Sequence, residues 1–196
     1  MKKLIEGFVR YKTEVYPQHR ELFRELASQQ SPDTLFIACS DSRVVPGVLL
    51  QAGPGELFVC RNAGNIAPSY GEHAGGVSAT IEYAVQILRV KHIVVCGHSD
   101  CGAMKAAMYP ELVSSLPAIS QWLRHTDRAM AVVNETCGDA DDARKLELLI
   151  EENVLSQLDN LMTHPSVAAK VRSGALELHG WVYDIPHCEF QVYDAA

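Results

Sequence analysis

The sequence predicts an α/β protein built around a largely parallel β-sheet. Short continuous apolar runs at residues 34–39, 56–60 and 92–97 have the length and composition of strands buried on both faces. Segments with helical periodicity lie between and after them, and strands that alternate with helices favour a parallel sheet. We expect one domain over residues 1–196, with a helical arm at 1–28 and an α/β core at 33–190.

The remaining elements are predicted from periodicity, in chain order. An apolar stripe from about Lys3 to Tyr16 predicts a helix that Pro17 ends, and residues 20–27 predict a second helix. This arm is expected either to cover its own core or to grip a partner subunit. Further helices are predicted at 75–90 and 143–162, and an alternating, partly exposed strand at 176–183. The polar stretch at 136–142 is expected to be an exposed loop.

Composition and charge exclude several classes of protein. The chain is 47% hydrophobic and 21% charged, with 17 basic and 24 acidic residues and a formal net charge of −7. An acidic chain of this kind argues against nucleic acid or an anionic membrane as the main partner. The N-terminal segment lacks the apolar stretch of a secretory signal, and the sequence has no membrane-spanning run. We therefore expect a cytoplasmic protein without a disulfide framework.

Two clusters of chemically active residues follow predicted strands. Cys39 comes at the end of the first strand, and the segment from His98 to Cys101 follows the third. Because ligands gather beyond the carboxyl ends of parallel strands, the clusters meet if the two strands are neighbours. Two thiolates and an imidazole are a zinc ligand set with one tetrahedral position to spare. A fourth protein ligand would make the site structural, whereas water there would make it catalytic.

Asp41 and Arg43 lie directly after the first candidate ligand. A carboxylate two residues from a metal ligand can reach the metal or its bound water, and an arginine can clamp that carboxylate with paired hydrogen bonds. The alternative is a surface ion pair of little consequence. Each cysteine can also be interpreted as a small apolar residue of the core. That reading is preferred for Cys60 and Cys96, which lie inside apolar runs, and nothing assigns a role to Cys137 or Cys188.

These motifs resemble the β-class carbonic anhydrases. The likeness rests on Cys-Ser-Asp-Ser-Arg at 39–43 and His-x-x-Cys-Gly at 98–102. It is extended by segments at 55–65, 75–84 and 179–183, covers about residues 3–190, and is greatest for the plant-type and bacterial cyanate-operon enzymes. The resemblance implies a mostly parallel sheet with one antiparallel edge strand flanked by helices. It also implies a zinc enzyme that forms homodimers, which can assemble into tetramers or octamers.

The resemblance also assigns residues. It implies Cys39, His98 and Cys101 as zinc ligands, and Asp41 with Arg43 as the dyad beside the metal. The plant-type pocket positions correspond to Gln30, which donates a hydrogen bond to substrate or bicarbonate, to Phe58 and Tyr83, and to Gly102 on the pocket floor. Part of the pocket wall then comes from the dimer mate.

One position departs from a bacterial subtype that bicarbonate inhibits. That subtype holds bicarbonate away from the zinc with a tryptophan, an arginine and a tyrosine. Here Phe36 stands at the tryptophan position, while Arg61 and Tyr183 are present. We predict that the zinc stays open near neutral pH, with Asp41 paired to Arg43 and coordinating the metal only in a closed state.

The function we expect is the reversible hydration of carbon dioxide to bicarbonate by attack of zinc hydroxide, with Asp41 orienting the hydroxide. Two thiolates neutralise the zinc formally, so the rate is expected to climb between about pH 7 and 9. His73 is one candidate proton shuttle, and solvent buffer is another. Two alternatives stay open: a hydrolase of carbon disulfide or carbonyl sulfide on the same site, and a structural zinc module with Asp41 as permanent fourth ligand.

Overall fold

A computed structural model of the chain describes residues 1–71 and 75–194, and it divides into two compact units, Met1–Ser31 and Pro32–Ala196. The first unit is helical throughout. Helix α1 (Lys2–Arg10) continues into a π-helical turn (Tyr11–Val15), a 3-10 turn (Tyr16–His19) and helix α2 (Arg20–Leu26). Both helices expected in the arm are present, and Pro17 lies in the turn between them. Leu4 and Phe8 of the predicted apolar stripe are exposed.

The second unit is built on one five-stranded sheet with the order β2-β1-β3-β4-β5. Its strands are β1 (Thr34–Cys39), β2 (Leu57–Asn62), β3 (His92–His98), β4 (Glu177–Asp184) and β5 (Glu189–Asp194). All neighbours are parallel except β4 and β5, which run antiparallel. The α/β prediction and its four strands are confirmed. The antiparallel edge strand implied by the resemblance is β5, which periodicity alone did not locate.

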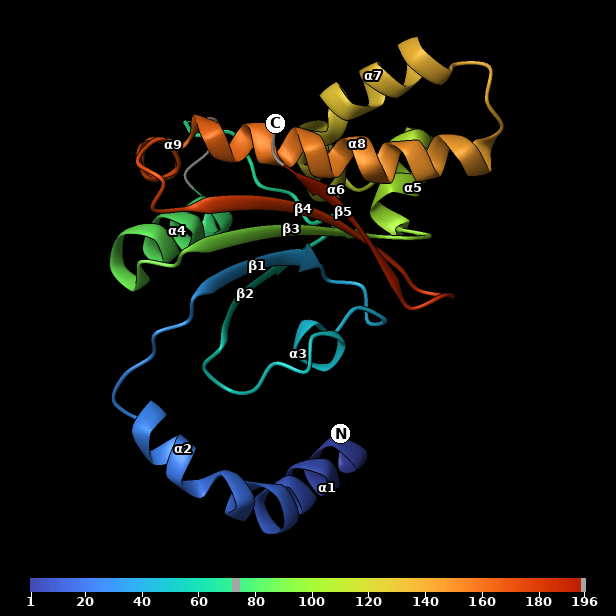
Figure 1. The fold of residues 1–196 in the computed structure, drawn as a ribbon. Coiled ribbons are helices and arrows are strands. Elements are labelled where there is room, and N and C mark those ends of the chain that lie inside the picture. Colours follow the sequence, from blue (N-terminus) through green and yellow to red (C-terminus); the bar gives the residue numbers. More distant parts are fainter. Residues whose placement is uncertain (72–74, 195–196) are drawn as a thin grey trace. The chain divides into compact units, whose positions relative to one another are not determined.

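Helices cover the sheet and connect its strands (Figure 1). The predicted helices are present as α4 (Gly76–Tyr83) with a π-helical turn (Ala84–Leu88), and as α8 (Asp142–Thr163). The structure adds α3 (Pro46–Leu49), α5 (Gly102–Met108), α6 (Pro117–Leu123), α7 (Asp127–Cys137) and α9 (Pro165–Arg172). Two further 3-10 turns are formed by Pro110–Val113 and Arg124–Thr126. The loop expected at 136–142 is shorter than predicted, because α7 extends to Cys137 and α8 begins at Asp142.

Glycines on two strands allow α8 to pack closely on the sheet. A Cβ atom at Gly97 of β3 would lie 2.9 Å from Val154 Cγ2, and one at Gly180 of β4 would lie 2.9 Å from Val154 Cγ1. Val154 is fully buried, as are Leu149 and Leu161 of the same helix. Any larger residue at either glycine would push the helix from the strands. The close fit fixes the end of β3 and the middle of β4 against α8.

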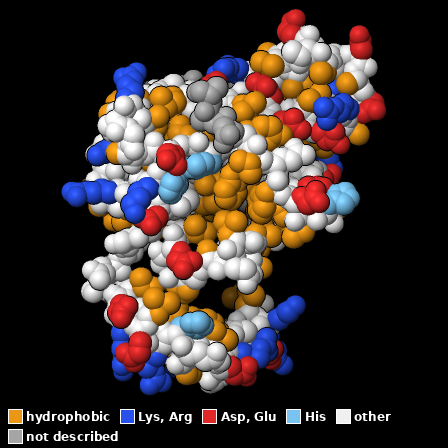
Figure 2. Space-filling model, in the orientation of Figure 1, with side chains coloured by type: hydrophobic (Ala, Val, Ile, Leu, Met, Phe, Trp, Pro, Cys, Tyr) orange, Lys and Arg blue, Asp and Glu red, His pale blue; other side chains and the backbone are white. Residues whose placement is uncertain are grey.

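A smaller apolar cluster lies on the opposite face of the sheet. It contains Phe36, Val94, Cys96 and Tyr183, with Trp181 packed edge-on against Phe36 at a centroid distance of 5.9 Å. Figure 2 shows hydrophobic side chains gathered over the strands on this side.

Among the described residues, no helix combines the length and apolar character required to cross a bilayer.

Candidate metal centre

The carboxyl ends of β1 and β3 bring three predicted ligands together. The two strands are parallel neighbours, so Cys39 at the end of β1 and His98 at the end of β3 lie at the same edge of the sheet. Cys101 follows three residues later, just before α5. The two sulfurs and one imidazole nitrogen all lie within 4.8 Å of one another, and all three residues are buried. Because β1 and β3 are neighbours, the two clusters of candidate ligands meet, as predicted.

The electrostatics of this cluster favour a thiolate. A hydrogen bond from Cys101 is the largest influence on Cys39, whose pKa falls to about 4, and contacts with His98 and the Gly64 N–H act in the same direction against burial. The Gly64 N–H donates to Cys39 Sγ over 3.4 Å. The pKa of Cys101 is raised because it shares a proton with Cys39 and is itself buried. The protein therefore already stabilises one thiolate at this position.

The donor set fits a zinc ion. His98 is fully buried, and its Nδ1 lies 2.9 Å from the Ser99 carbonyl oxygen, which fixes the ring. Its Nε2 has no hydrogen-bond partner within the part of the chain that the structure describes. A buried polar atom without a partner is costly, so such an atom beside two cysteines is suited to bind a metal ion. Two sulfurs and an imidazole nitrogen are ordinary zinc ligands, and they leave one tetrahedral position open.

Asp41 and Arg43 form the predicted pair beside this cluster. Arg43 Nε donates to Asp41 Oδ1 over 3.0 Å and Nη2 donates to Oδ2 over 2.8 Å, while the Arg43 backbone N–H also donates to Oδ1. These bonds hold the pKa of Asp41 well below its usual range. Asp41 Oδ2 lies 3.9 Å from His98 Nε2, so the carboxylate stands next to the unpartnered nitrogen. Both oxygens of Asp41 are nevertheless occupied by Arg43.

Arg43 is itself held from a second side, which the sequence analysis did not foresee. Its Nη1 donates to Asp100 Oδ2 over 3.1 Å and its Nη2 to the Asp100 carbonyl oxygen over 3.2 Å. Asp100 is in turn paired with Lys105, and the two cations lower its pKa, Lys105 more than Arg43. Asp100 adopts the left-handed conformation, at φ 58°. The only hint of this contact in the sequence was the acidic residue Asp100 between His98 and Cys101.

The loop after β2 completes the wall around Cys39, and buried polar residues of α8 hold it. Asn153 Nδ2 donates to the Gly64 carbonyl oxygen over 3.1 Å, and Gln157 Oε1 accepts from the Ala67 N–H over 3.0 Å. Asn153 and Gln157 are essentially fully buried and are bonded to each other. Sequence reasoning missed both. The pattern that could have revealed them is a pair of amide side chains, four residues apart, on the apolar face of the predicted helix.

The predicted pocket residues are placed as follows. Phe58 and Tyr83 pack against each other with ring centroids 5.9 Å apart, and Tyr83 remains 44% exposed. Gly102 is exposed, and a Cβ atom there would meet nothing within 4 Å. Gln30 lies in the N-terminal unit. His73, the candidate proton shuttle, lies outside the described residues.

Phe36, Arg61 and Tyr183, the three positions compared with the bicarbonate-inhibited subtype, contact other parts of the chain. Phe36 is buried in the apolar cluster with Tyr183. Arg61 Nε donates to the Cys39 carbonyl oxygen over 3.0 Å and its Nη2 to the Asp41 carbonyl oxygen over 2.7 Å. The Arg61 guanidinium therefore braces the backbone between the ligand and the Asp41–Arg43 pair.

The cysteines interpreted as core residues are buried. Cys60 and Cys96 belong to the two apolar clusters, and burial raises the pKa of Cys96 to about 12. Cys188 is exposed and Cys137 is half-buried.

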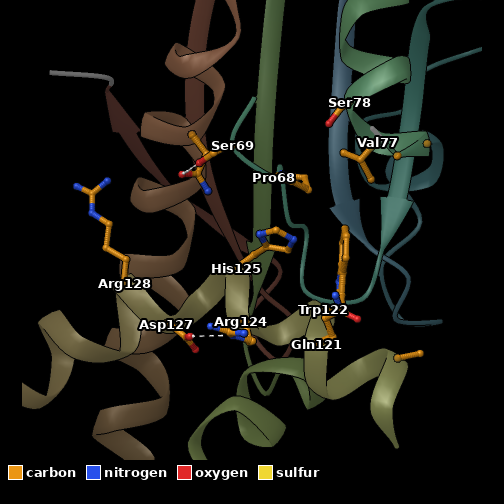
Figure 3. A pocket seen from close by; sticks show the side chains of 14 residues that line it. Pro68, Ser69, Val77, Ser78, Gln121, Trp122, Arg124, His125, Asp127 and Arg128 are labelled. Atoms are coloured by element: carbon orange, nitrogen blue, oxygen red, sulfur yellow. Dashed lines mark hydrogen bonds and ion pairs between the residues drawn. The ribbon is translucent and has the colours of Figure 1, made fainter. Parts of the chain in front are cut away.

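A separate cavity of about 880 Å³ lies among α4, α6 and α7. Figure 3 shows Trp122 and His125 at its wall, with the Arg124–Asp127 ion pair at its lower rim. The Trp122 indole donates to the Ala63 carbonyl oxygen over 2.8 Å, which links the cavity wall to the loop beside Cys39. Among the described residues that line it, none is a predicted ligand or pocket residue.

Comparisons with known proteins point to one family. The sequence model of the carbonic anhydrase family matches residues 34–190. A carbonic anhydrase of Pseudomonas aeruginosa is 52% identical over 196 residues, which cover 100% of this chain and 89% of that protein. The solved structure of the beta-carbonic anhydrase CcaA has a TM-score of 0.97 and 42% identity, covering 99% of this chain and 95% of that one. A tetrameric beta-carbonic anhydrase of Sordaria macrospora has a TM-score of 0.83 at 29% identity, covering 97% and 95%.

Proposed function

The chain belongs to the β-class carbonic anhydrases, and from this membership we propose that it hydrates carbon dioxide reversibly at a zinc ion held by Cys39, His98 and Cys101. The products are bicarbonate and a proton. The observation that carries the proposal is the convergence of two sulfurs and an unpartnered, fully buried imidazole nitrogen at one edge of the sheet. Zinc bound there supplies a Lewis acid that lowers the pKa of a coordinated water, and so provides the nucleophile near neutral pH.

Asp41 is proposed to orient the attacking oxygen. Its carboxylate lies beside His98 Nε2 and is kept ionised by Arg43, so it remains a hydrogen-bond acceptor across the physiological pH range. Arg43 uses both carboxylate oxygens and thereby disfavours Asp41 as a metal ligand. This arrangement supports an open catalytic site over a closed structural module. Arg43 acts here as a positioning residue, because its contacts are with Asp41 and Asp100.

The substrate pocket is proposed from the resemblance to the plant-type enzymes. Phe58 and Tyr83 form a packed aromatic pair, which suits a small apolar molecule. Gly102 leaves open space directly after the Cys101 ligand. Gln30 is proposed to donate a hydrogen bond to the substrate or to bicarbonate. Carbonyl sulfide and carbon disulfide are also small linear electrophiles, so the same preparation should be assayed against them.

We propose that the protein works as a homodimer that can assemble further. Exposed apolar side chains on the helical arm, among them Leu4 and Phe8, support a partner copy as their cover. The tetrameric relatives from Sordaria macrospora support higher assembly. All six cysteines are free, which supports a reducing compartment such as the cytoplasm. Light scattering during size-exclusion chromatography measures the assembly.

Stopped-flow hydration with a pH indicator, combined with metal analysis, tests the proposed activity. Cys101→Ser is expected to lose zinc and hydration together, because it removes a ligand. Cys188→Ser is the matched control, since Cys188 is exposed and makes no contact with the proposed ligands in the described structure, and it should keep both. Full activity of the purified protein after rigorous zinc removal would refute the proposal.

A further inference from the structure

A second cluster of metal-binding side chains lies at the opposite end of β3. His92 is the first residue of β3, and Glu177 and His179 lie near the start of β4. His92 is paired in register with Glu177, and residues two apart on a strand share a face, so all three side chains emerge on one side of the sheet. Figure 1 shows the starts of β3 and β4 side by side, away from α5.

The donor atoms of this cluster have the spacing of a metal coordination sphere. His92 Nδ1 lies 3.2 Å from His179 Nε2 and 3.3 Å from Glu177 Oε2, and His179 Nε2 lies 3.7 Å from Glu177 Oε2. A tetrahedral zinc ion with ligands at about 2.0–2.1 Å places neighbouring donors about 3.3–3.4 Å apart. The three observed separations therefore bracket the edges of such a tetrahedron.

The chemistry of the three groups also fits a cation. Two imidazole nitrogens 3.2 Å apart accommodate a single hydrogen between them, because two facing N–H groups would repel each other. A divalent metal ion instead uses a lone pair from each ring, and Glu177 contributes negative charge. Two nitrogens and one carboxylate oxygen suit zinc and neighbouring transition metals better than calcium or magnesium.

Exposure distinguishes this cluster from the catalytic one. The side chains of His92, His179 and Glu177 are 39%, 28% and 65% exposed, so an ion and a water molecule can reach them directly. His92 and His98 begin and end the same strand, which puts the two clusters roughly 20 Å apart at about 3.3 Å per residue. The outer cluster contains no cysteine. It should therefore exchange its metal with solvent while the buried cysteine cluster keeps its own.

We propose that His92, Glu177 and His179 form a second, solvent-accessible site for a divalent transition-metal ion such as Zn²⁺. This site is separate from the one proposed for carbon dioxide hydration. The three side chains would hold the ion at the first residues of β3 and β4, and a water molecule would complete its coordination.

Calorimetric titration of Zn²⁺ into the zinc-loaded full-length protein tests the proposal. The wild type should take up one further equivalent. Since changes to residues that merely support a ligand weaken metal binding about 10–100-fold, removing two direct ligands in His92→Gln/His179→Gln should weaken it by more than that. His187→Gln is the matched control, because His187 is an exposed histidine paired with one carboxylate, Asp184, and its loss should change nothing.

The variants are compared on the same zinc-loaded background, so the result does not depend on whether the buried cysteine site is catalytic. Glu177→Gln, at the most exposed of the three side chains, provides a second test if the double variant does not fold. Anomalous diffraction from a zinc-soaked crystal should place an ion among the three donor atoms. The proposal is overturned if the wild type takes up no further zinc, if the folded ligand variants bind it as the wild type does, or if His187→Gln loses it equally.

Discussion

Gly97 and Gly102 flank the His-x-x-Cys segment and differ in the space that a methyl group would find. A Cβ atom at Gly97 would lie 2.9 Å from Val154 Cγ2 and 3.3 Å from Ile150 Cγ2. Comfortable contacts between carbon atoms are about 3.5–4.0 Å, so Gly97→Ala requires α8 and β3 to separate. At Gly102 the same methyl group would meet nothing within 4 Å.

These distances set the expected size of the effect. Overpacking a well-filled core costs ~1–3 kcal/mol, and the lower chain entropy of unfolded alanine offsets ~0.4–1 kcal/mol of it. Gly97→Ala should therefore lower the free energy of unfolding by ~1–2 kcal/mol, which for a chain of this size lowers Tm by about 2–8 °C. Gly102→Ala should melt at the wild-type temperature or up to about 4 °C above it, because its methyl group meets no clash and the ~0.4–1 kcal/mol from the unfolded chain is unopposed.

Differential scanning calorimetry of the zinc-loaded variants at one fixed zinc concentration measures both shifts. Hydration rates on the same samples separate stability from function. If Gly102 lies on the pocket floor, its alanine variant should lose hydration activity without any fall in Tm. A Gly97→Ala protein that melts with the wild type, or a Gly102→Ala protein destabilised as much as Gly97→Ala, would show that the packing argument is wrong.

Three further outcomes are expected. Asp41→Asn should lower kcat/KM roughly 10²-fold in stopped-flow assays, the scale of a lost proton acceptor, while metal analysis shows zinc retained; unchanged kcat/KM contradicts the proposed role. In the zinc-loaded protein, Cys188 should react promptly with a thiol reagent at pH 8, whereas Cys96 stays protected by burial and its raised pKa until unfolding. Labelling of Cys96 in the fast phase, identified by peptide mass spectrometry, contradicts this. The pKa of His187 is raised by Asp184, so their pairing stabilises the fold below about pH 6.5 and is lost as pH rises through the folded pKa; an NMR titration should show that pKa fall in Asp184→Asn, and no change would exclude the pairing.

The elements that could be predicted from the sequence are those that bury one whole face or both faces in the core. Strands β1 and β3 are continuous apolar runs, and α8 has a long apolar stripe, so periodicity alone finds them. Strand β5 was missed because polar residues interrupt it and Val192 is exposed, so it has no continuous apolar run; β2, at the other edge of the sheet, begins with such a run. Helices α5 and α6 were missed, although α2, which also has seven residues, was predicted.

The site was predictable to the extent that it is local in sequence. Cys39 and Asp41 share one loop, and His98 and Cys101 share another, so each half could be found by spacing. The contacts that join the halves could not. The bond from Arg43 to Asp100 spans 57 positions, and that from Asn153 to the Gly64 carbonyl spans 89. Such contacts depend on strand order and helix placement, which no local pattern encodes.

Strand order explains why the two halves meet. The chain passes from β1 outward to β2, then crosses back over β1 to form β3 on its other side. The connections that leave β1 and β3 therefore depart in opposite directions, and a crevice opens beyond the ends of this pair. Cys39 and His98 are the terminal residues of these two strands, so they occupy the rim of that crevice. With β3 at the outer edge beside β2, the same motifs would be a strand apart, and one ion could not reach both.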